Sequence, residues 1–113
     1  MSSDYFEIVD DGTRLVTLRG ELDAHDAPRL RATFADALEG VPEAPRVVLD
    51  LAQVSFLDST ALGSIVGLLR RVREMDGELR VVLPSAAAAR IFEITGLDAI
   101  LVTYPTRAAA LEA

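Results

Sequence analysis

The sequence contains no cysteine and only one histidine, His25. Without cysteine the chain can form no disulfide, no thiolate nucleophile and no cysteine-ligated metal centre, and one histidine excludes multi-histidine metal sites. Carboxylates, hydroxyls and arginines are the side chains that remain for chemistry. We therefore expect neither a bound metal nor a cofactor.

Positive charge and long hydrophobic runs are also scarce. Eleven basic residues, all of them arginine, stand against 18 Asp and Glu, for a formal net charge of −7. Binding to nucleic-acid phosphates needs the opposite balance, so we expect no nucleic-acid partner. No apolar stretch approaches the roughly 20 residues of a membrane span, and Met1-Ser2-Ser3-Asp4 does not open a signal peptide. These absences predict a cytoplasmic protein without a membrane span.

Half of the 113 residues are hydrophobic, which is enough for one ordinary core and predicts a single domain over residues 1–113. Alternation at 5–9 and 15–19, around the turn residues Asp10-Asp11-Gly12, predicts an N-terminal β-hairpin. Apolar runs and helical spacing alternate after it, which predicts strands at 47–51, 79–83 and 99–102 and helices after Asp26, after Asp58, around Ile91 and after Thr106.

Strands that alternate with helices require crossover connections, so we expect an α/β fold. Its sheet should have about five strands, mostly parallel, with the N-terminal hairpin adding an antiparallel pair. Arg80 lies inside the strand predicted at 79–83, and a sheet buried on both faces rarely carries a charge there. This position favours helices that cover mainly one face of the sheet.

The segment Asp58-Ser59-Thr60 begins the second predicted helix. Its apolar positions are expected at Leu62, Ile65, Val66, Leu69 and Val72. In one interpretation Asp58 caps the helix and the two hydroxyls are ordinary first-turn residues. In the other, a hydroxyl at this helix end accepts a phosphoryl group, because the positive end of the helix dipole stabilises an anion.

A second polar cluster, Asp23, His25 and Asp26, precedes the first predicted helix. One interpretation is a metal site, and the other is that Asp26 caps the helix while Asp23 shapes the loop. Nucleotide-binding glycine motifs, the G-x-S-x-G nucleophile motif and the H-E-x-x-H zinc motif are all absent. We therefore do not expect an enzyme.

Gly63 and Gly67 are spaced one helical turn apart on the second predicted helix. Glycines at this spacing permit close approach of another backbone, either the protein's own sheet or a partner. If the apolar positions face the core, the outward stripe of this helix comprises Thr60, Ser64, Gly67 and Arg71.

Three segments of the chain occur together in one known family: Gly20-Glu21-Leu22-Asp23, Leu57-Asp58-Ser59-Thr60-Ala61-Leu62-Gly63 and Arg90-Ile91-Phe92-Glu93-Ile94-Thr95-Gly96-Leu97. Over essentially its full length the chain resembles the STAS-domain anti-sigma-factor antagonists of bacteria. The second segment is the most specific, although many members have glycine where this chain has Ala61.

The resemblance implies a phosphorylation switch. In that family the serine after the aspartate is phosphorylated by an anti-sigma factor that is also a serine kinase, and here that serine is Ser59. The unphosphorylated antagonist binds the kinase and frees the sigma factor, and a serine phosphatase restores it. On this hypothesis the partner-binding surface comprises Asp23, Asp58, Ser59, Thr60, Ser64 and Gly67, and the free protein is a monomer.

Two other hypotheses stay open. In the first, the chain is a STAS-type scaffold or an accessory subunit of a lipid or anion transporter, and Ser59 is not phosphorylated. In the second, it binds or hydrolyses a nucleotide at a site centred on Asp23 and Ser59.

Overall fold

The computed structural model describes residues 5–9, 11–41, 43–83 and 86–113. Five strands form one sheet in the order β1-β2-β3-β4-β5. β1 and β2 pair antiparallel, whereas all the other neighbours pair parallel. The strands are β1 (Tyr5–Ile8), β2 (Arg14–Leu22), β3 (Arg46–Leu57), β4 (Glu78–Val82) and β5 (Val102–Tyr104). The predicted α/β fold, its mostly parallel sheet and the N-terminal hairpin are confirmed, while Asp10 of the predicted turn lies outside the described residues.

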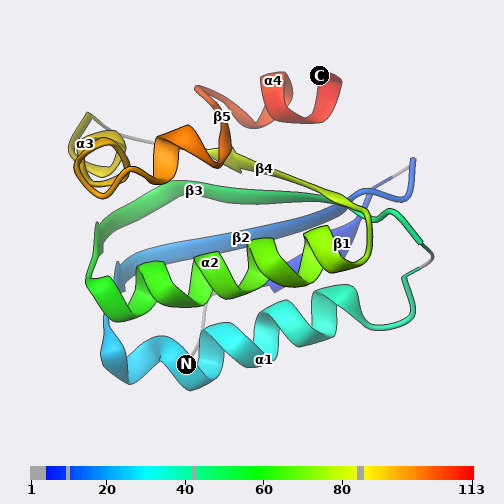
Figure 1. The fold of residues 1–113 in the computed structure, drawn as a ribbon, viewed down its shortest axis with the longest axis horizontal. Helices are drawn as coiled ribbons and strands as arrows, with labels where there is room; N and C mark the ends of the chain where they lie inside the picture. The colour runs from blue at the N-terminus through cyan, green and yellow to red at the C-terminus, as the bar shows by residue number, and fades with distance from the viewer. Residues whose placement is uncertain (1–4, 10, 42, 84–85) are drawn as a thin grey trace.

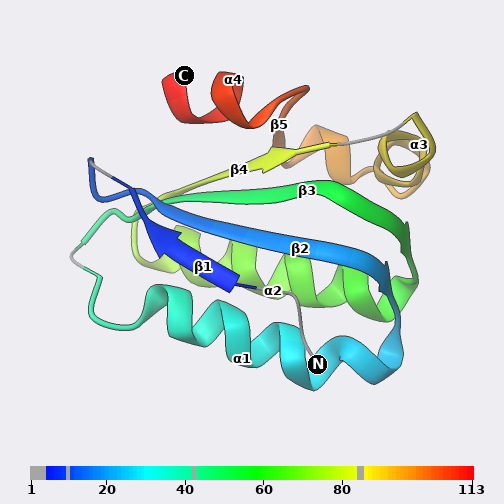
Figure 2. The same cartoon turned by 180° about the vertical axis from the view of Figure 1, so that it is seen from behind.

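The two long helices, α1 (Ala27–Leu38) and α2 (Ser59–Glu74), lie side by side against one face of the sheet (Figure 1). The view from behind shows the short α4 (Arg107–Glu112) on the opposite face (Figure 2). α3 (Ala86–Ile94) lies beside the end of the sheet where β3 leads into α2. The prediction that helices cover mainly one face is therefore confirmed for the two long helices, and α4 partly covers the other.

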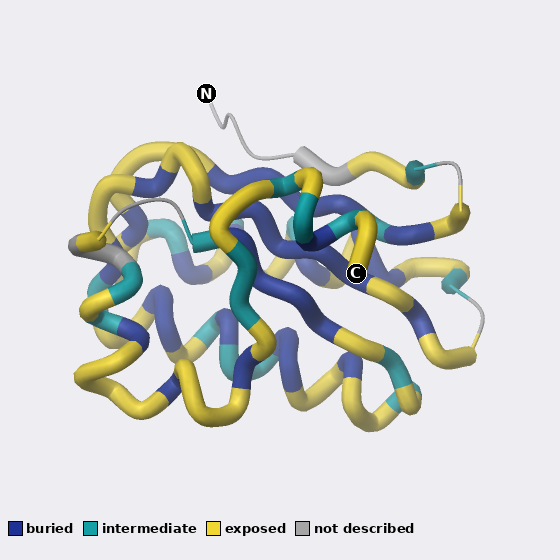
Figure 3. Tube along the Cα trace, turned by 90° about the horizontal axis from the view of Figure 1, so that it is seen from above, coloured by how far each residue is buried: buried dark blue, intermediate teal, exposed yellow. Residues whose placement is uncertain are grey.

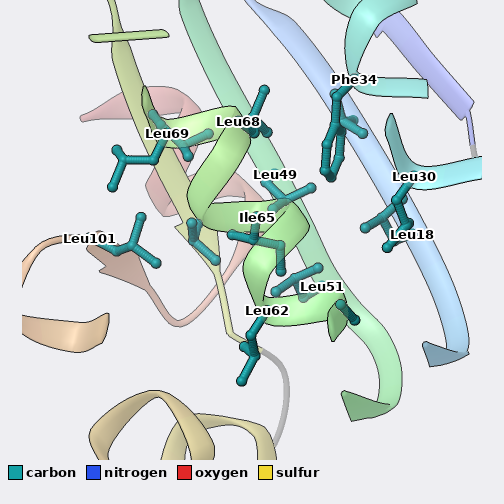
Figure 4. Close-up of a cluster of buried hydrophobic side chains, with 14 of the residues drawn as sticks. Leu18, Leu30, Phe34, Leu49, Leu51, Leu62, Ile65, Leu68, Leu69 and Leu101 are labelled. Atoms are coloured by element: carbon teal, nitrogen blue, oxygen red, sulfur yellow. The ribbon is translucent and has the colours of Figure 1, made fainter. Parts of the chain in front are cut away.

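The main core lies between the sheet and the two long helices (Figure 4). On α1 the apolar residues at helical spacing are all buried: Leu30, Phe34, Ala37 and Leu38. On α2 four of the five predicted positions are buried, whereas Val66 is only half-buried. Leu68, which the predicted stripe omitted, is buried and faces the same core.

A smaller apolar cluster lies under α4 and includes Leu15, Val48 and Ala110. Arg80 is buried beside it and does not mark an open face: its Nη1 donates to the Ala110 carbonyl at 2.9 Å, and its Nε pairs with Glu78 at 3.0 Å. A charged residue inside this strand is therefore no sign of an uncovered sheet face, and that interpretation of Arg80 is wrong. A guanidinium can be buried in a strand when a carboxylate and the last carbonyls of a helix accept its hydrogen bonds.

Several strand boundaries differ from those predicted. β2 and β3 continue to Leu22 and Leu57 because they pair with each other through two register shifts, although these ends carry polar residues. In Figure 3 the strands β2 and β3 are buried through their middle and more exposed toward these ends. The last strand begins at Val102 and not at Ala99, since Leu97–Ala99 forms a 3₁₀ turn.

Candidate functional site

Asp58 caps the start of α2. Its backbone is extended, and its Oδ1 accepts a hydrogen bond from the Ala61 N–H at 2.9 Å. One of the unpaired amides of the first helical turn is satisfied in this way, as expected for aspartate at an N-cap. The predicted capping role of Asp58 is confirmed.

The same carboxylate joins α2 to the loop after β2. Asp58 Oδ2 accepts a hydrogen bond from the Ala24 N–H at 3.0 Å, and the Asp58 N–H donates to the Leu22 carbonyl at 3.1 Å. Both carboxylate oxygens of Asp58 therefore accept hydrogen bonds, one from α2 and one from Ala24, which lies 34 residues earlier in the chain. This arrangement brings the predicted Asp23 loop and the Ser59 end of α2 together on one surface.

The loop itself is built by its two aspartates. Asp23 accepts a hydrogen bond from the His25 N–H at 2.9 Å, and Asp26 accepts one from the Asp23 N–H at 2.8 Å. The pKa of Asp26 is lowered by this backbone N–H and by the Arg29 guanidinium, 2.8 Å away. Asp26 occupies the N-cap position of α1, but its side chain accepts no capping hydrogen bond from the backbone of that helix. It closes the preceding 3₁₀ turn instead, so the prediction that Asp26 caps the helix is wrong.

The metal interpretation of this loop has no support in the geometry. No group of three or more histidines, aspartates or glutamates within the described ranges is arranged to hold a metal ion. The aspartates of the loop have backbone N–H groups and an arginine as partners, which explains their presence structurally.

Ser59 is the first residue of α2 and is exposed, as is Thr60. No described residue holds the Ser59 hydroxyl in a hydrogen bond. α2 is 16 residues long, so its N-terminus carries the positive end of a substantial helix dipole. A hydroxyl in this position can be modified without breaking a contact of the fold, and the helix end favours the negative charge that phosphorylation adds.

The predicted outward stripe of α2 lines a groove between α2 and α1, and its volume is about 510 Å³. Thr60 is exposed, whereas Ser64 and Gly67 are half-buried in the groove. A Cβ added at Gly63 or Gly67 would meet nothing within 4 Å. These glycines therefore do not pack against the protein's own sheet, which was one of the two alternatives, and they face open space.

Sequence reasoning missed the contribution of α1 to this groove. Arg31 and Phe34 form its α1 side, and Arg70 and Glu74 continue it along α2. No spacing signal could reveal this, because the two helices are separate in the sequence and meet only by packing on the same sheet face.

The family model of the STAS domain matches residues 8–110, which is almost the whole chain. This chain belongs to the STAS-domain family. An anti-sigma-B factor antagonist of Listeria monocytogenes is 39% identical over 88 residues, covering 76% of this chain and 74% of that protein. The predicted family membership is confirmed, and the relatives that this STAS domain resembles carry the names of regulatory proteins rather than enzymes.

Solved STAS domains have the same fold. An anti-sigma factor antagonist from Mycobacterium paratuberculosis is 31% identical with a TM-score of 0.85, covering 97% of this chain and 91% of that one. The Bacillus cell fate determinant SpoIIAA in its phosphorylated form is 25% identical with a TM-score of 0.72, covering 97% of each chain. Among the described helices of this STAS domain, none is long and apolar enough to cross a membrane.

Proposed function

We propose that this STAS domain is an anti-sigma factor antagonist that is switched by phosphorylation. Its unphosphorylated form binds an anti-sigma factor that is also a serine kinase, and so releases a sigma factor. Phosphorylation of Ser59 ends this binding, and a serine phosphatase restores it. The names of its Listeria and Mycobacterium relatives support the antagonist role.

The observation that carries the proposal is the exposed Ser59 directly after the capping Asp58. Asp58 positions the first turn of α2 and the Asp23 loop together, so a kinase can approach the hydroxyl over a preformed surface. A structural relative that has been solved in a phosphorylated form adds support for modification within this fold. The partner-binding surface on this proposal comprises Asp23, Asp58, Ser59, Thr60, Ser64 and Gly67.

Electrostatics explains how the phosphate would act on the complex while sparing the fold. The phosphate adds about −1.5 to −2 charges beside Asp58. Two unit charges about 6 Å apart repel by roughly 0.7 kcal/mol in water, and by roughly 2.8 kcal/mol at an effective dielectric constant near 20. A bound partner that covers Ser59 excludes water, so the repulsion grows in the complex, whereas the free helix end tolerates the charge.

The test is phosphorylation by the anti-sigma factor kinase of the same organism. The purified protein is incubated with ATP and the kinase, and the modified residue is located by mass spectrometry. We expect modification at Ser59, its loss in Ser59→Ala and its persistence in the matched control Thr60→Ala. Kinase binding should fall after phosphorylation and return after phosphatase treatment. Binding partners of another kind, with Ser59 unmodified, would favour the transporter-accessory hypothesis instead.

A further inference from the structure

The groove between α1 and α2 runs along most of α2. On α2 it is lined at intervals of three or four residues from Thr60 through Ser64, Gly67 and Arg71 to Glu74. At 1.5 Å per residue this stripe is about 21 Å long, or about four turns of helix. Its length suits an extended or helical segment better than a compact small molecule.

The floor of the groove is apolar and allows close approach. Phe34 and Leu68 line it, and both belong to the buried core. Gly63 and Gly67 add no side chain above this floor, and a Cβ at either position would meet nothing. A helix can therefore lie close to the α2 backbone here, with its small apolar residues against Phe34 and Leu68.

The rim of the groove is positively charged. Arg31, Arg70 and Arg71 line it and are exposed, against one carboxylate, Glu74. None of the three arginine side chains forms an ion pair or hydrogen bond with a residue that the structure describes. This is unusual on a chain whose net charge is −7. Unpaired arginines beside an apolar floor are complementary to a segment that carries carboxylates along the edges of an apolar face.

We propose that the groove receives an amphipathic, acidic helix of the anti-sigma kinase. The partner's apolar stripe packs over Gly63 and Gly67, and its carboxylates pair with Arg31, Arg70 and Arg71. The inference rests on the proposed function and adds the chemistry of the partner segment. It also explains the switch further: Ser59 precedes Thr60 at one end of the groove, so a phosphate there repels an acidic helix.

The first test fills the groove without harming the fold. In Gly67→Leu the new side chain occupies the open space, and leucine favours helix more than glycine, so the variant should melt no lower than the wild type. We expect its affinity for the anti-sigma kinase, measured by calorimetry, to fall at least about tenfold. The matched control is Ala32→Leu, which adds the same side chain on α1 at an exposed position outside the groove.

The second test reverses the rim charge. Arg31→Glu combined with Arg71→Glu should weaken kinase binding about tenfold at low salt, with a smaller difference at high salt, because rim charges act through screened electrostatics. Arg90→Glu is the control, since Arg90 is exposed on α3 and lies outside the groove.

Three outcomes would overturn the inference. Wild-type affinity in both the Gly67→Leu and charge-reversed proteins would show that the kinase binds elsewhere, with the proposed function intact. Absence of kinase binding by the wild type would reject the proposed function together with this inference. A wild-type dimer in sedimentation that Gly67→Leu converts to a monomer would identify a second copy of the chain as the occupant.

Discussion

Arg107, the first residue of α4, donates from Nε to Oδ2 of Asp50 in β3 at 2.7 Å. Asp50 is almost fully buried, and its other oxygen accepts the Ala52 N–H at 2.8 Å. Arg107 also donates from Nη2 to the Thr17 hydroxyl at 3.3 Å. The ion pair therefore connects α4 to β3, and the hydrogen bond to Thr17 connects it to β2.

Removing the arginine should destabilise the protein. Arg107→Met leaves the buried Asp50 carboxylate without its ion-pair partner, which should lower the free energy of unfolding by about 2–3 kcal/mol. Part of the usual cost is spared because the Arg107 side chain is 39% exposed, so water can reach the site. Urea denaturation measures the change. The double variant Asp50→Asn/Arg107→Met removes the charge as well and should lose less, whereas equal stabilities of wild type and Arg107→Met would contradict the prediction.

The stability contributed by Asp26 should depend on pH. Hydrogen bonds from the Asp23 N–H and Arg29 lower the pKa of Asp26 below its ordinary value of 3.8. A lowered folded-state pKa means that the contribution is complete above about pH 4 and is lost as the pH falls through the folded value. Asp26→Asn should therefore be less stable than the wild type at pH 7.

Thermal unfolding of both proteins from pH 7 to pH 2.5 checks this expectation. The difference between their melting temperatures should shrink below about pH 4, as the wild-type carboxylate becomes neutral. Asp36→Asn is the control, since Asp36 is exposed on α1. A difference in melting temperature that stays constant from pH 7 to pH 2.5 would mean that the charge of Asp26 does not contribute to stability.

Ser59→Asp should imitate the phosphorylated protein only in part. Aspartate supplies one charge and two oxygens, whereas phosphoserine supplies up to two charges and three acceptor oxygens farther from the backbone. The substitution should weaken the kinase complex by about 1 kcal/mol, or about fivefold, and phosphorylation should weaken it more. Calorimetric titration of the kinase with wild-type, Ser59→Asp and phosphorylated protein makes the comparison.

The melting curves of the same three proteins provide the control. Because helix N-termini favour acidic residues, Ser59→Asp should melt at or slightly above the wild-type temperature. If Ser59→Asp binds the kinase weakly and also melts at a lower temperature than the wild type, Ser59 has a structural role. If the phosphorylated protein binds the kinase as tightly as the wild type, the switch is refuted.

Ser64→Arg should weaken the kinase complex while preserving the fold. Ser64 is half-buried in the groove, and its Oγ makes only a long hydrogen bond of 3.4 Å to the Thr60 carbonyl. Arginine favours helix and would fill the groove, so we expect a roughly tenfold loss of affinity, about 1.4 kcal/mol, with little change in melting temperature. Ala32→Arg adds the same charge outside the groove and should bind normally. Unchanged affinity of Ser64→Arg would move the interface away from this part of α2.

Local sequence signals located the capped end of α2 well. Aspartate at an N-cap and the spacing of Leu62, Ile65 and Leu69 act within one or two helical turns, so they remain readable without the rest of the fold. Local signals did not predict the full lengths of β2 and β3. The polar ends of these strands adopt strand structure because they pair with each other, and a local pattern does not show that pairing.

One inference was wrong and one question stayed open, because both needed information about distant neighbours. Arg80 is compatible with a covered face only because α4, 30 residues later, brings the Ala110 carbonyl to it. Likewise, sequence reasoning left open whether Gly63 and Gly67 approach the sheet or a partner, and the space around them depends on how α1 and α2 sit side by side.

The sequence by itself determined the α/β alternation, the capped helix that presents Ser59, and the net negative charge, because each of these depends on neighbouring residues or on simple addition. Only the tertiary structure decided that Asp58 binds the Ala24 N–H across 34 residues, and that Arg31 of α1 shares a groove with Arg71 of α2. Both relationships arise from elements packed together on one sheet, where side chains far apart in the sequence meet at distances that no local pattern encodes.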